Sequence, residues 1–194
     1  MKQTETIYLA SKSPRRSEIL SLMGLTFEVV DSKADENVGR LAPAAMVEML
    51  SKRKAEQAVV SKRRCVVIGS DTVVTYRGKV LGKPKDKEDA KRMLRLLSGK
   101  RSAVYTGVTV QVRGKDVRTV TFHTKTDVIF DELTDAEIDE YIATGDPMDK
   151  AGAYGIQGIF GRHISGIRGD FYNVMGLPMN DLYKTLIKEK IIFI

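Results

Sequence analysis

Three cations surround a predicted helix start near the beginning of the chain. Ser13 followed by Pro14 predicts a helix N-terminus, because serine is a favoured N-cap and proline suits the first helical position. Lys12, Arg15 and Arg16 therefore lie where the positive end of the helix dipole disfavours cations. A bound polyphosphate would offset that repulsion, since backbone N–H groups and arginines both bind phosphoryl oxygens. The alternative interpretation is that all three cations face solvent.

Two carboxylates stand where they could hold a metal and activate water. Asp71 follows the apolar segment 65–70, which predicts a buried strand, and the end of such a strand is a usual place for a catalytic carboxylate. Glu36 lies in an acidic loop after the second predicted strand. Two carboxylates together with substrate phosphates are a normal way for a protein to hold Mg²⁺. An aspartate at a strand end also often forms a turn, so both interpretations of Asp71 stay open on these grounds.

The elements that must position these residues alternate between strands and helices. Apolar spacing and capping residues predict helices at 14–24, from Pro43 to about Val60, from Asp86 to Leu97, after Thr134 and from Met179 to Lys190. β-Branched and alternating segments predict strands at 7–10, 26–30, 65–76, 104–112 and 117–130. Early alternation followed by a long antiparallel pair indicates an α/β fold with a mixed sheet.

Composition argues against several classes of protein. The 194 residues are 42% hydrophobic, which is enough for a real core, and no apolar run approaches a membrane span. The N-terminus has no apolar stretch of the kind found in secretion signals, so we expect a soluble, cytoplasmic protein. Cys65 is the only cysteine, which excludes an intrachain disulfide, and it is predicted to be a buried strand residue. His123 and His163 have no metal-ligand spacing, so a zinc site is not expected.

The formal net charge of +7 suits either nucleic acid or a small polyanionic substrate. The cations are dispersed among 25 acidic residues, and none of the usual nucleic-acid modules has its motif here. Two basic runs stand out, at 52–54 and 62–64, and the second is predicted to cap and solvate the end of a helix. Within the first run, Lys52 and Arg53 are predicted to face solvent.

Several motifs together give the chain a family resemblance. The pattern S-x-S-P-R-R directly follows the first predicted strand, and four further segments follow in order: Gly69–Val74, Gly82–Pro84, Asp149–Gly158 and Asn173–Pro178. With these motifs the chain resembles the Maf family of nucleoside triphosphate pyrophosphatases over nearly its whole length. The resemblance implies a long, twisted mixed β-sheet flanked by helices, with two lobes and a central cleft, as in Maf and inosine-triphosphate-pyrophosphatase-like folds. It also implies a single domain over residues 1–194 and suggests a homodimer.

The resemblance also implies a reaction, the hydrolysis of dTTP or UTP to the monophosphate and pyrophosphate. Asp71 would be the general base that takes a proton from the attacking water, and Glu36 and Asp71 would hold a divalent cation, Mg²⁺ or Mn²⁺. The two roles of Asp71 compete, since a carboxylate bound directly to a cation is a weaker base. Contacts to the triphosphate are implied for Ser13, Arg15, Arg16, Lys54 and Lys83.

Selectivity for the base is implied for a further set of positions. In the branch of the family that acts on dTTP and UTP, the selective positions match Arg16, Thr72 and Gln157, and all three residue types agree. The side-chain amide of Gln157 offers a donor and an acceptor to the polar edge of a pyrimidine. The branch that hydrolyses 7-methyl-GTP differs at these positions, so thymine and uracil nucleotides, including modified ones, are the expected substrates.

Several points stay open in the sequence. The same chemistry could act on 7-methyl-GTP or another base, and a non-enzymatic nucleic-acid-binding or septum-formation regulator is a rival supported only by the basic balance. Lys150 either contacts phosphate or forms a structural ion pair with Asp149. Ser70 stands where many relatives carry alanine, and segment 161–166 is more polar than the strand expected there.

Overall fold

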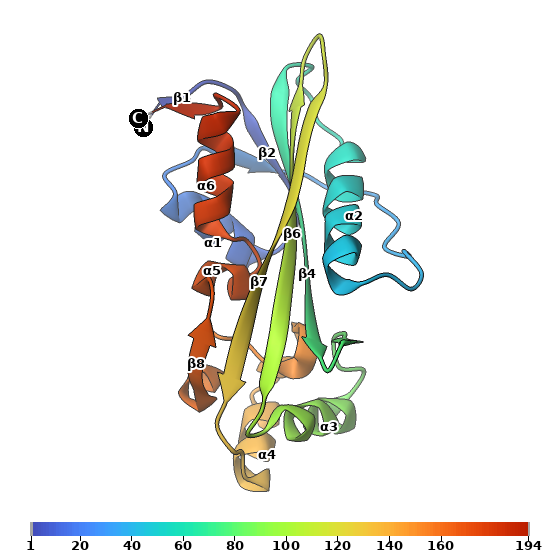
Figure 1. Ribbon diagram of the computed structural model, residues 1–194, viewed down its shortest axis with the longest axis vertical. Helices are drawn as coiled ribbons and strands as arrows, with labels where there is room; N and C mark the ends of the chain where they lie inside the picture. The colour runs from blue at the N-terminus through green and yellow to red at the C-terminus, as the bar shows by residue number, and fades with distance from the viewer. Residues whose placement is uncertain (1, 194) are drawn as a thin grey trace. The chain divides into compact units, whose positions relative to one another are not determined.

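The computed structural model describes residues 2–193, and Figure 1 shows their helices and strands. The α-helices are α1 (Pro14–Leu22), α2 (Pro43–Glu56), α3 (Lys87–Leu97), α4 (Asp135–Ala143), α5 (Phe171–Met175) and α6 (Met179–Lys188). Short 3₁₀ helices are η1 (Asp146–Asp149), η2 (Ala151–Ala153) and η3 (Ile159–His163). The strands are β1 (Lys2–Gln3), β2 (Ile7–Ala10), β3 (Phe27–Val29), β4 (Cys65–Tyr76), β5 (Lys79–Leu81), β6 (Arg101–Arg113), β7 (Arg118–Phe130), β8 (Ile164–Arg168) and β9 (Ile192–Phe193). The helices and strands expected from the sequence are present, with ends that differ by a few residues.

The larger sheet is mixed, with the strand order β3-β2-β4-β6-β7-β8 and with β5 paired to β4. Strand β2 pairs in parallel with β3 and with β4, whereas the pairs β4–β5 and β7–β8 are antiparallel. Strands β1 and β9 form a separate antiparallel pair. The expected α/β class, a mixed sheet flanked by helices, is confirmed.

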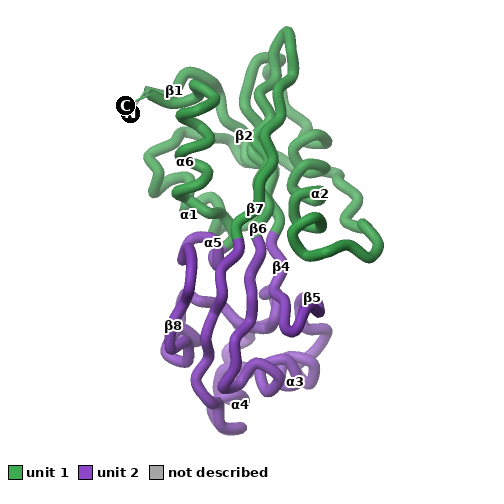
Figure 2. Tube along the Cα trace, viewed as in Figure 1, with its two compact units in different colours: residues 1–71, 106–124, 176–194 green, residues 72–105, 125–175 purple. Residues whose placement is uncertain are grey.

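The chain divides into two compact units, which Figure 2 colours separately. The first comprises residues 1–71, 106–124 and 176–194, and the second comprises residues 72–105 and 125–175. Strands β4, β6 and β7 contribute residues to both units. The central cleft implied by the family resemblance stays a prediction.

Two glycines let helix α2 approach the strands of the first unit closely. A methyl group added at Gly69 on β4 would overlap the backbone carbonyl of Ser51, and one added at Gly107 on β6 would overlap that of Val47. Ser51 is fully buried, and its hydroxyl shares a 2.9 Å hydrogen bond with Thr109 on β6. In Figure 1, α2 covers one face of these strands, while α1 and α6 lie on the other. Backbone contact therefore fixes the distance between α2 and the sheet.

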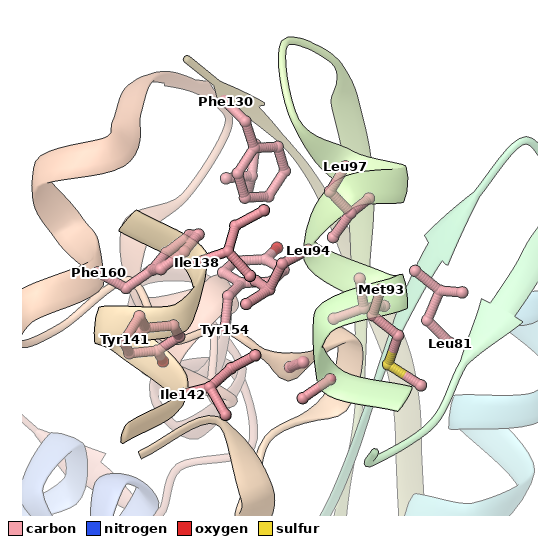
Figure 3. Close-up of a cluster of buried hydrophobic side chains, with 14 of the residues drawn as sticks. Leu81, Met93, Leu94, Leu97, Phe130, Ile138, Tyr141, Ile142, Tyr154 and Phe160 are labelled. Atoms are coloured by element: carbon pink, nitrogen blue, oxygen red, sulfur yellow. The ribbon is translucent and has the colours of Figure 1, made fainter. Parts of the chain in front are cut away.

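The second unit is built around a cluster of aromatic and aliphatic side chains, shown in Figure 3. The ring of Tyr154 meets that of Phe130 edge to face, with 4.8 Å between centroids, and lies 5.8 Å from that of Phe160. Burial raises the pKa of the Tyr154 hydroxyl, which shares a 3.1 Å hydrogen bond with Ser102. The buried Tyr154 and Phe160 anchor both ends of the short segment that carries Gln157.

The prediction that the basic run 62–64 caps the end of a helix is wrong. Helix α2 ends at Glu56, so the run lies in the connection to β4 instead. Arg64 forms an ion pair with Glu5 at 2.7 Å. Lys62 also donates to Thr6 Oγ1 at 2.9 Å, so Lys62 and Arg64 bind the segment before β2 rather than a helix end.

Cys65 and the helix start at Thr134 agree with the sequence-based predictions, whereas segment 161–166 agrees only in part. Cys65 is buried at the start of β4, as predicted, and burial raises the pKa of its thiol. The helix expected after Thr134 begins with a capping box, in which Glu137 Oε2 accepts from the Thr134 N–H at 2.8 Å. Segment 161–166 divides between η3 and β8, so the strand expected there begins only at Ile164.

Within residues 2–193, every helix is too short or too polar to cross a membrane.

We expect Gly107→Ala to lower the free energy of unfolding by about 1–3 kcal/mol, because the added methyl group would push α2 away from β6. Urea denaturation followed by circular dichroism measures this change. Gly114→Ala is the matched control, since the nearest atom to an added Cβ there is the Asp116 carbonyl oxygen at 3.9 Å. Equal denaturation midpoints for the two variants would contradict the close approach of α2 to the sheet.

Candidate functional site

The parallel pairing of β2 with β4 brings the first motif next to Asp71. Ala10, the last residue of β2, lies opposite Gly69 on β4. Residues 11–13 follow Ala10, and Ser70 and Asp71 follow Gly69. The two segments therefore start side by side at the same end of the parallel pair. The carboxyl-terminal edge of parallel strands is the usual place for a binding site in an α/β sheet.

Helix α1 begins where the sequence predicts, with Ser13 at the N-cap position and Pro14 as the first helical residue. Ser13 has the extended backbone of an N-cap. Within the part of the chain that the structure describes, however, its hydroxyl accepts no hydrogen bond from the first N–H groups of α1. Its own N–H donates to Ser11 Oγ at 3.3 Å. The first turn of α1 contains Arg15 and Arg16 and no acidic residue. This helix end therefore combines a dipole and side chains that all favour an anion.

Two acceptors hold the Arg16 guanidinium in one orientation. Its Nε donates to the Gly176 carbonyl at 2.8 Å, and its Nη1 donates to Ser11 Oγ at 2.8 Å. Burial lowers the pKa of this guanidinium from its ordinary value, while attraction to the Asp71 carboxylate opposes the shift. Arginine stays protonated in proteins, so Arg16 presents a fixed positive charge whose field acts on Asp71.

Lys54 joins the two candidate carboxylates. Its ammonium nitrogen lies 2.8 Å from Glu36 Oε1 and 2.6 Å from Asp71 Oδ1. The side chains of Lys54 and Asp71 are 16% and 14% exposed, whereas that of Glu36 is 68% exposed. Helix α2 supplies Lys54, β4 supplies Asp71, and the loop after β3 supplies Glu36. The structure thus brings Lys54, named from the sequence as a phosphate contact, together with the two carboxylates named as a metal-holding pair.

The Glu36–Lys54–Asp71 cluster has the donor types of a magnesium or manganese site. Both carboxylates reach one ammonium nitrogen, so both can reach a single cation that takes its place. Among residues 2–193, no group of three or more His, Cys, Asp or Glu side chains is arranged to hold a metal ion. A cation here would keep water or phosphate oxygens as its remaining ligands, as Mg²⁺ commonly does. The residues present fit such an ion.

The remaining candidates belong to the second unit. Thr72 directly follows Asp71 on β4 and is half-buried, Lys83 is exposed in the loop after β5, and Gln157 is half-buried between η2 and η3. The Gly82 carbonyl accepts from the Gly152 N–H at 2.9 Å, which ties the loop of Lys83 to the glycine-rich segment. The roles of these three candidates stay predictions.

Lys150 is engaged in an ion-pair network within the second unit. Its ammonium donates to the Asp146 carbonyl at 2.7 Å, to Asp146 Oδ1 at 2.8 Å and to Asp149 Oδ1 at 2.7 Å. Tyr141 donates to the other carboxylate oxygen of Asp146 at 2.7 Å. Burial acts to raise the pKa of Asp146, but the hydrogen bonds from Lys150 and Tyr141 outweigh it, and the net shift is downward. These contacts favour the structural interpretation of Lys150.

Two further cations have partners that lie far away in sequence. The prediction that Arg53 faces solvent is wrong, because its Nη1 donates to the carbonyl oxygens of Asp35 and Asn37, both at 2.9 Å. Lys12 forms an ion pair with Asp31 at 3.0 Å, and both side chains are mostly exposed. Such a surface pair contributes only about 0–1 kcal/mol to stability. Asp31 therefore neutralises the charge of Lys12, but the pair adds little to the stability of the fold.

Gly176 and Ser70 belong to the site although the sequence analysis gave them no role. The buried Ser70 hydroxyl donates at 3.0 Å to the Gly176 carbonyl, the same oxygen that accepts from Arg16. Gly176 has a φ of 116°, in the region that favours glycine. The available signal was the glycine within the motif 173–178, since glycine readily adopts the positive φ that this position has.

Comparison with known proteins shows which protein family this sequence matches. The model of the family described as Maf-like protein matches residues 6–189. A dTTP/UTP pyrophosphatase of Agathobacter rectalis is 50% identical over 197 residues, covering 94% of this chain and 96% of that protein. A dTTP/UTP pyrophosphatase of Bacillus cytotoxicus is 49% identical over 179 residues, covering 92% of each.

Solved structures share the fold at much lower identity. The Ham1 protein of Staphylococcus aureus matches with a TM-score of 0.53 and 17% identity, and the alignment covers 95% of this chain and 100% of that chain. A HAM1 protein from Coxiella burnetii matches with a TM-score of 0.52 and 13% identity over the same shares. These likenesses concern the fold alone, whereas the family model and the half-identical relatives extend over most of the sequence. This chain therefore belongs to the Maf-like protein family.

Proposed function

We propose that this chain is a nucleoside triphosphate pyrophosphatase that converts dTTP and UTP, and modified pyrimidine nucleotides, to the monophosphate and pyrophosphate. The observation that carries the proposal is the Glu36–Lys54–Asp71 cluster, next to the cationic start of α1. Relatives that are about half identical over most of the chain bear the name of this activity. Residues 1–194 are proposed to work as one domain of this kind.

The reaction requires water to attack the α-phosphorus while the bond from that phosphorus to the bridging oxygen breaks, so that pyrophosphate leaves with that oxygen. Asp71 is assigned the role of general base, which accepts the proton of the water. Lys54 donates to Oδ1 of Asp71, so the other carboxylate oxygen is the one assigned to the water. Glu36 and Asp71 would hold Mg²⁺ or Mn²⁺, which when bound offsets the charge of the triphosphate.

Cationic and hydroxyl groups are assigned to the phosphates. Ser13 and Arg15 at the start of α1, together with Lys54, would contact the triphosphate oxygens, and Lys83 would balance charge on the leaving pyrophosphate. The uncapped start of α1 supports this assignment, because a phosphate oxygen accepts the same N–H hydrogen bonds that a capping side chain would otherwise accept.

Base selection is assigned to Arg16, Thr72 and Gln157. The two hydrogen bonds that fix the Arg16 guanidinium support this role, since an oriented donor discriminates between base edges better than a mobile one. Gln157 lies on a short segment whose ends are anchored by the buried Tyr154 and Phe160. Its amide is thereby restricted in the positions that it can take.

The cellular location proposed for this activity is the cytoplasm, where nucleoside triphosphates are available. Cys65, the only cysteine of the sequence, is a buried free thiol, which is compatible with a reducing compartment. The homodimer suggested by the family resemblance stays a proposal, and sedimentation velocity at several protein concentrations would test it.

We expect Asp71→Asn to reduce kcat for pyrophosphate release from dTTP by about 10²–10⁴-fold, because an amide does not accept the proton of the water. Binding of dTTP, measured by calorimetry, should change far less, since the proposed phosphate contacts remain. Asp31→Asn is the control, because it loses only the exposed ion pair with Lys12. A near-normal rate in Asp71→Asn would remove Asp71 as the base.

Lys54→Gln should separate metal binding from nucleotide binding. Without the ammonium, Glu36 and Asp71 lose their shared cation, so we expect Mn²⁺ to bind the nucleotide-free protein about 3–10-fold more tightly. The KM for dTTP should rise at the same time, because a phosphate contact is lost. Electron paramagnetic resonance of free Mn²⁺ and steady-state kinetics measure the two effects, with Lys52→Gln as the exposed control. Unchanged or weaker Mn²⁺ binding would argue against a cation site between the two carboxylates.

Gln157→Ala should lower kcat/KM for dTTP and UTP by about 10–100-fold while lowering it less for purine triphosphates, because the pyrimidine edge loses its hydrogen-bond partner. Pyrophosphate release from a panel of nucleoside triphosphates measures this selectivity. Gln57→Ala, at an exposed position after α2, is the control. A uniform loss across the panel would assign Gln157 to folding or general binding instead of base selection.

A further inference from the structure

The loop that carries Glu36 needs support from outside itself. It lies between β3 and α2 without regular secondary structure, and the Glu36 side chain is 68% exposed. Loop residues lose backbone entropy when they are ordered, and a largely exposed ion pair such as Glu36–Lys54 offsets little of that loss. A metal ligand on such a loop binds well only if its backbone is already held in place.

Arg53 supplies backbone support on both sides of Glu36. Its Nη1 donates to the carbonyl oxygen of Asp35 and to that of Asn37, both at 2.9 Å. These are the residues immediately before and after Glu36, so the peptide group before Glu36 and the one after Asn37 are both tied to helix α2. In Figure 1 the chain between β3 and α2 passes alongside that helix.

Hydrogen bonds within the loop complete this arrangement. The Asn37 N–H donates to Asp35 Oδ1 at 2.9 Å, and the Gly39 N–H donates to Asn37 Oδ1 at 3.3 Å. These local turns shape the segment, but they do not attach it to the rest of the first unit. The bonds from Arg53 do, and they come from the residue next to Lys54, which binds the Glu36 side chain.

We propose that Arg53 is a positioning residue, which holds the loop so that Glu36 can serve a divalent cation together with Asp71. Consecutive residues of α2 then act on the same part of the loop. Arg53 holds the carbonyl groups of the residues on either side of Glu36, and Lys54 binds the Glu36 carboxylate until a cation replaces the ammonium. This inference rests on the proposed function, in which Glu36 is a metal ligand.

Arg53→Gln tests the proposal, with Lys52→Gln as the control from the neighbouring, exposed position. We expect Arg53→Gln to weaken Mn²⁺ binding to the nucleotide-free protein about 10-fold, measured by electron paramagnetic resonance. Amide hydrogen exchange of residues 34–38 should become faster, while that of α2 stays unchanged. Arg53→Lys keeps a donor near both carbonyls and should recover part of the affinity.

Kinetics provide a second, independent measurement. The Mg²⁺ concentration that gives half-maximal pyrophosphate release should rise in Arg53→Gln, and saturating Mg²⁺ should recover most of the lost rate. Wild-type Mn²⁺ affinity in Arg53→Gln, or a loss that Lys52→Gln reproduces, would overturn the proposal. If the wild-type protein released no pyrophosphate, the proposed function would fail, whereas the Mn²⁺ and exchange measurements would still decide whether Arg53 organises a cation site.

Discussion

The close contact between helix α2 and strands β4 and β6 is the constraint on which the candidate site depends. Gly69 and Gly107 present no side chain to α2, so the helix backbone comes close to the strand backbone at these two positions. At that distance Lys54 reaches Asp71 at 2.6 Å. If the helix were displaced by the width of one methyl group, Lys54 would have to change its side-chain conformation to keep this contact within the usual range of about 2.7–3.2 Å.

The charges that this contact brings together alternate in sign. Arg16 acts on Asp71 through its field, Asp71 binds Lys54, and Lys54 binds Glu36. Partly buried charges are tolerated when each has an opposite neighbour. A triphosphate arriving alone would add several negative charges to this balanced set, whereas a triphosphate with a divalent cation would add fewer. Under the proposed function, the electrostatics of this cluster would favour a nucleotide that arrives together with a divalent cation.

A single carbonyl group connects the two ends of the sequence at this site. The Gly176 oxygen accepts from Arg16 Nε and from the Ser70 hydroxyl. It therefore joins the motif near the C-terminus to the start of α1 and to the end of the first buried run of β4. Ser70 is fully buried, and this hydrogen bond satisfies its hydroxyl. The motif 173–178 thus contributes a backbone group, which explains why a search for chemically active side chains gave it no role.

Much of the fold and part of the site follow from local sequence. Pro14 starts its helix and the Thr134 capping box starts another, because helix starts depend on residues within one turn. Asp71 could be named from the apolar segment that precedes it, although β4 continues past it to Tyr76. Lys54, on the helix before that strand, and the activity followed from the family resemblance. Helix α2 was expected to run beyond Glu56, since local spacing does not reveal where the chain turns toward β4.

The sequence by itself determined the types of the chemical groups and the elements that carry them. Only the tertiary structure decided which of those groups meet. Arg53 and Lys54 look alike as neighbouring cations on one helix, yet one binds backbone carbonyls and the other binds two carboxylates. The physical reason is that each partner lies on a different segment of the chain, and the position of that segment is set by long-range packing and strand register rather than by spacing in the sequence.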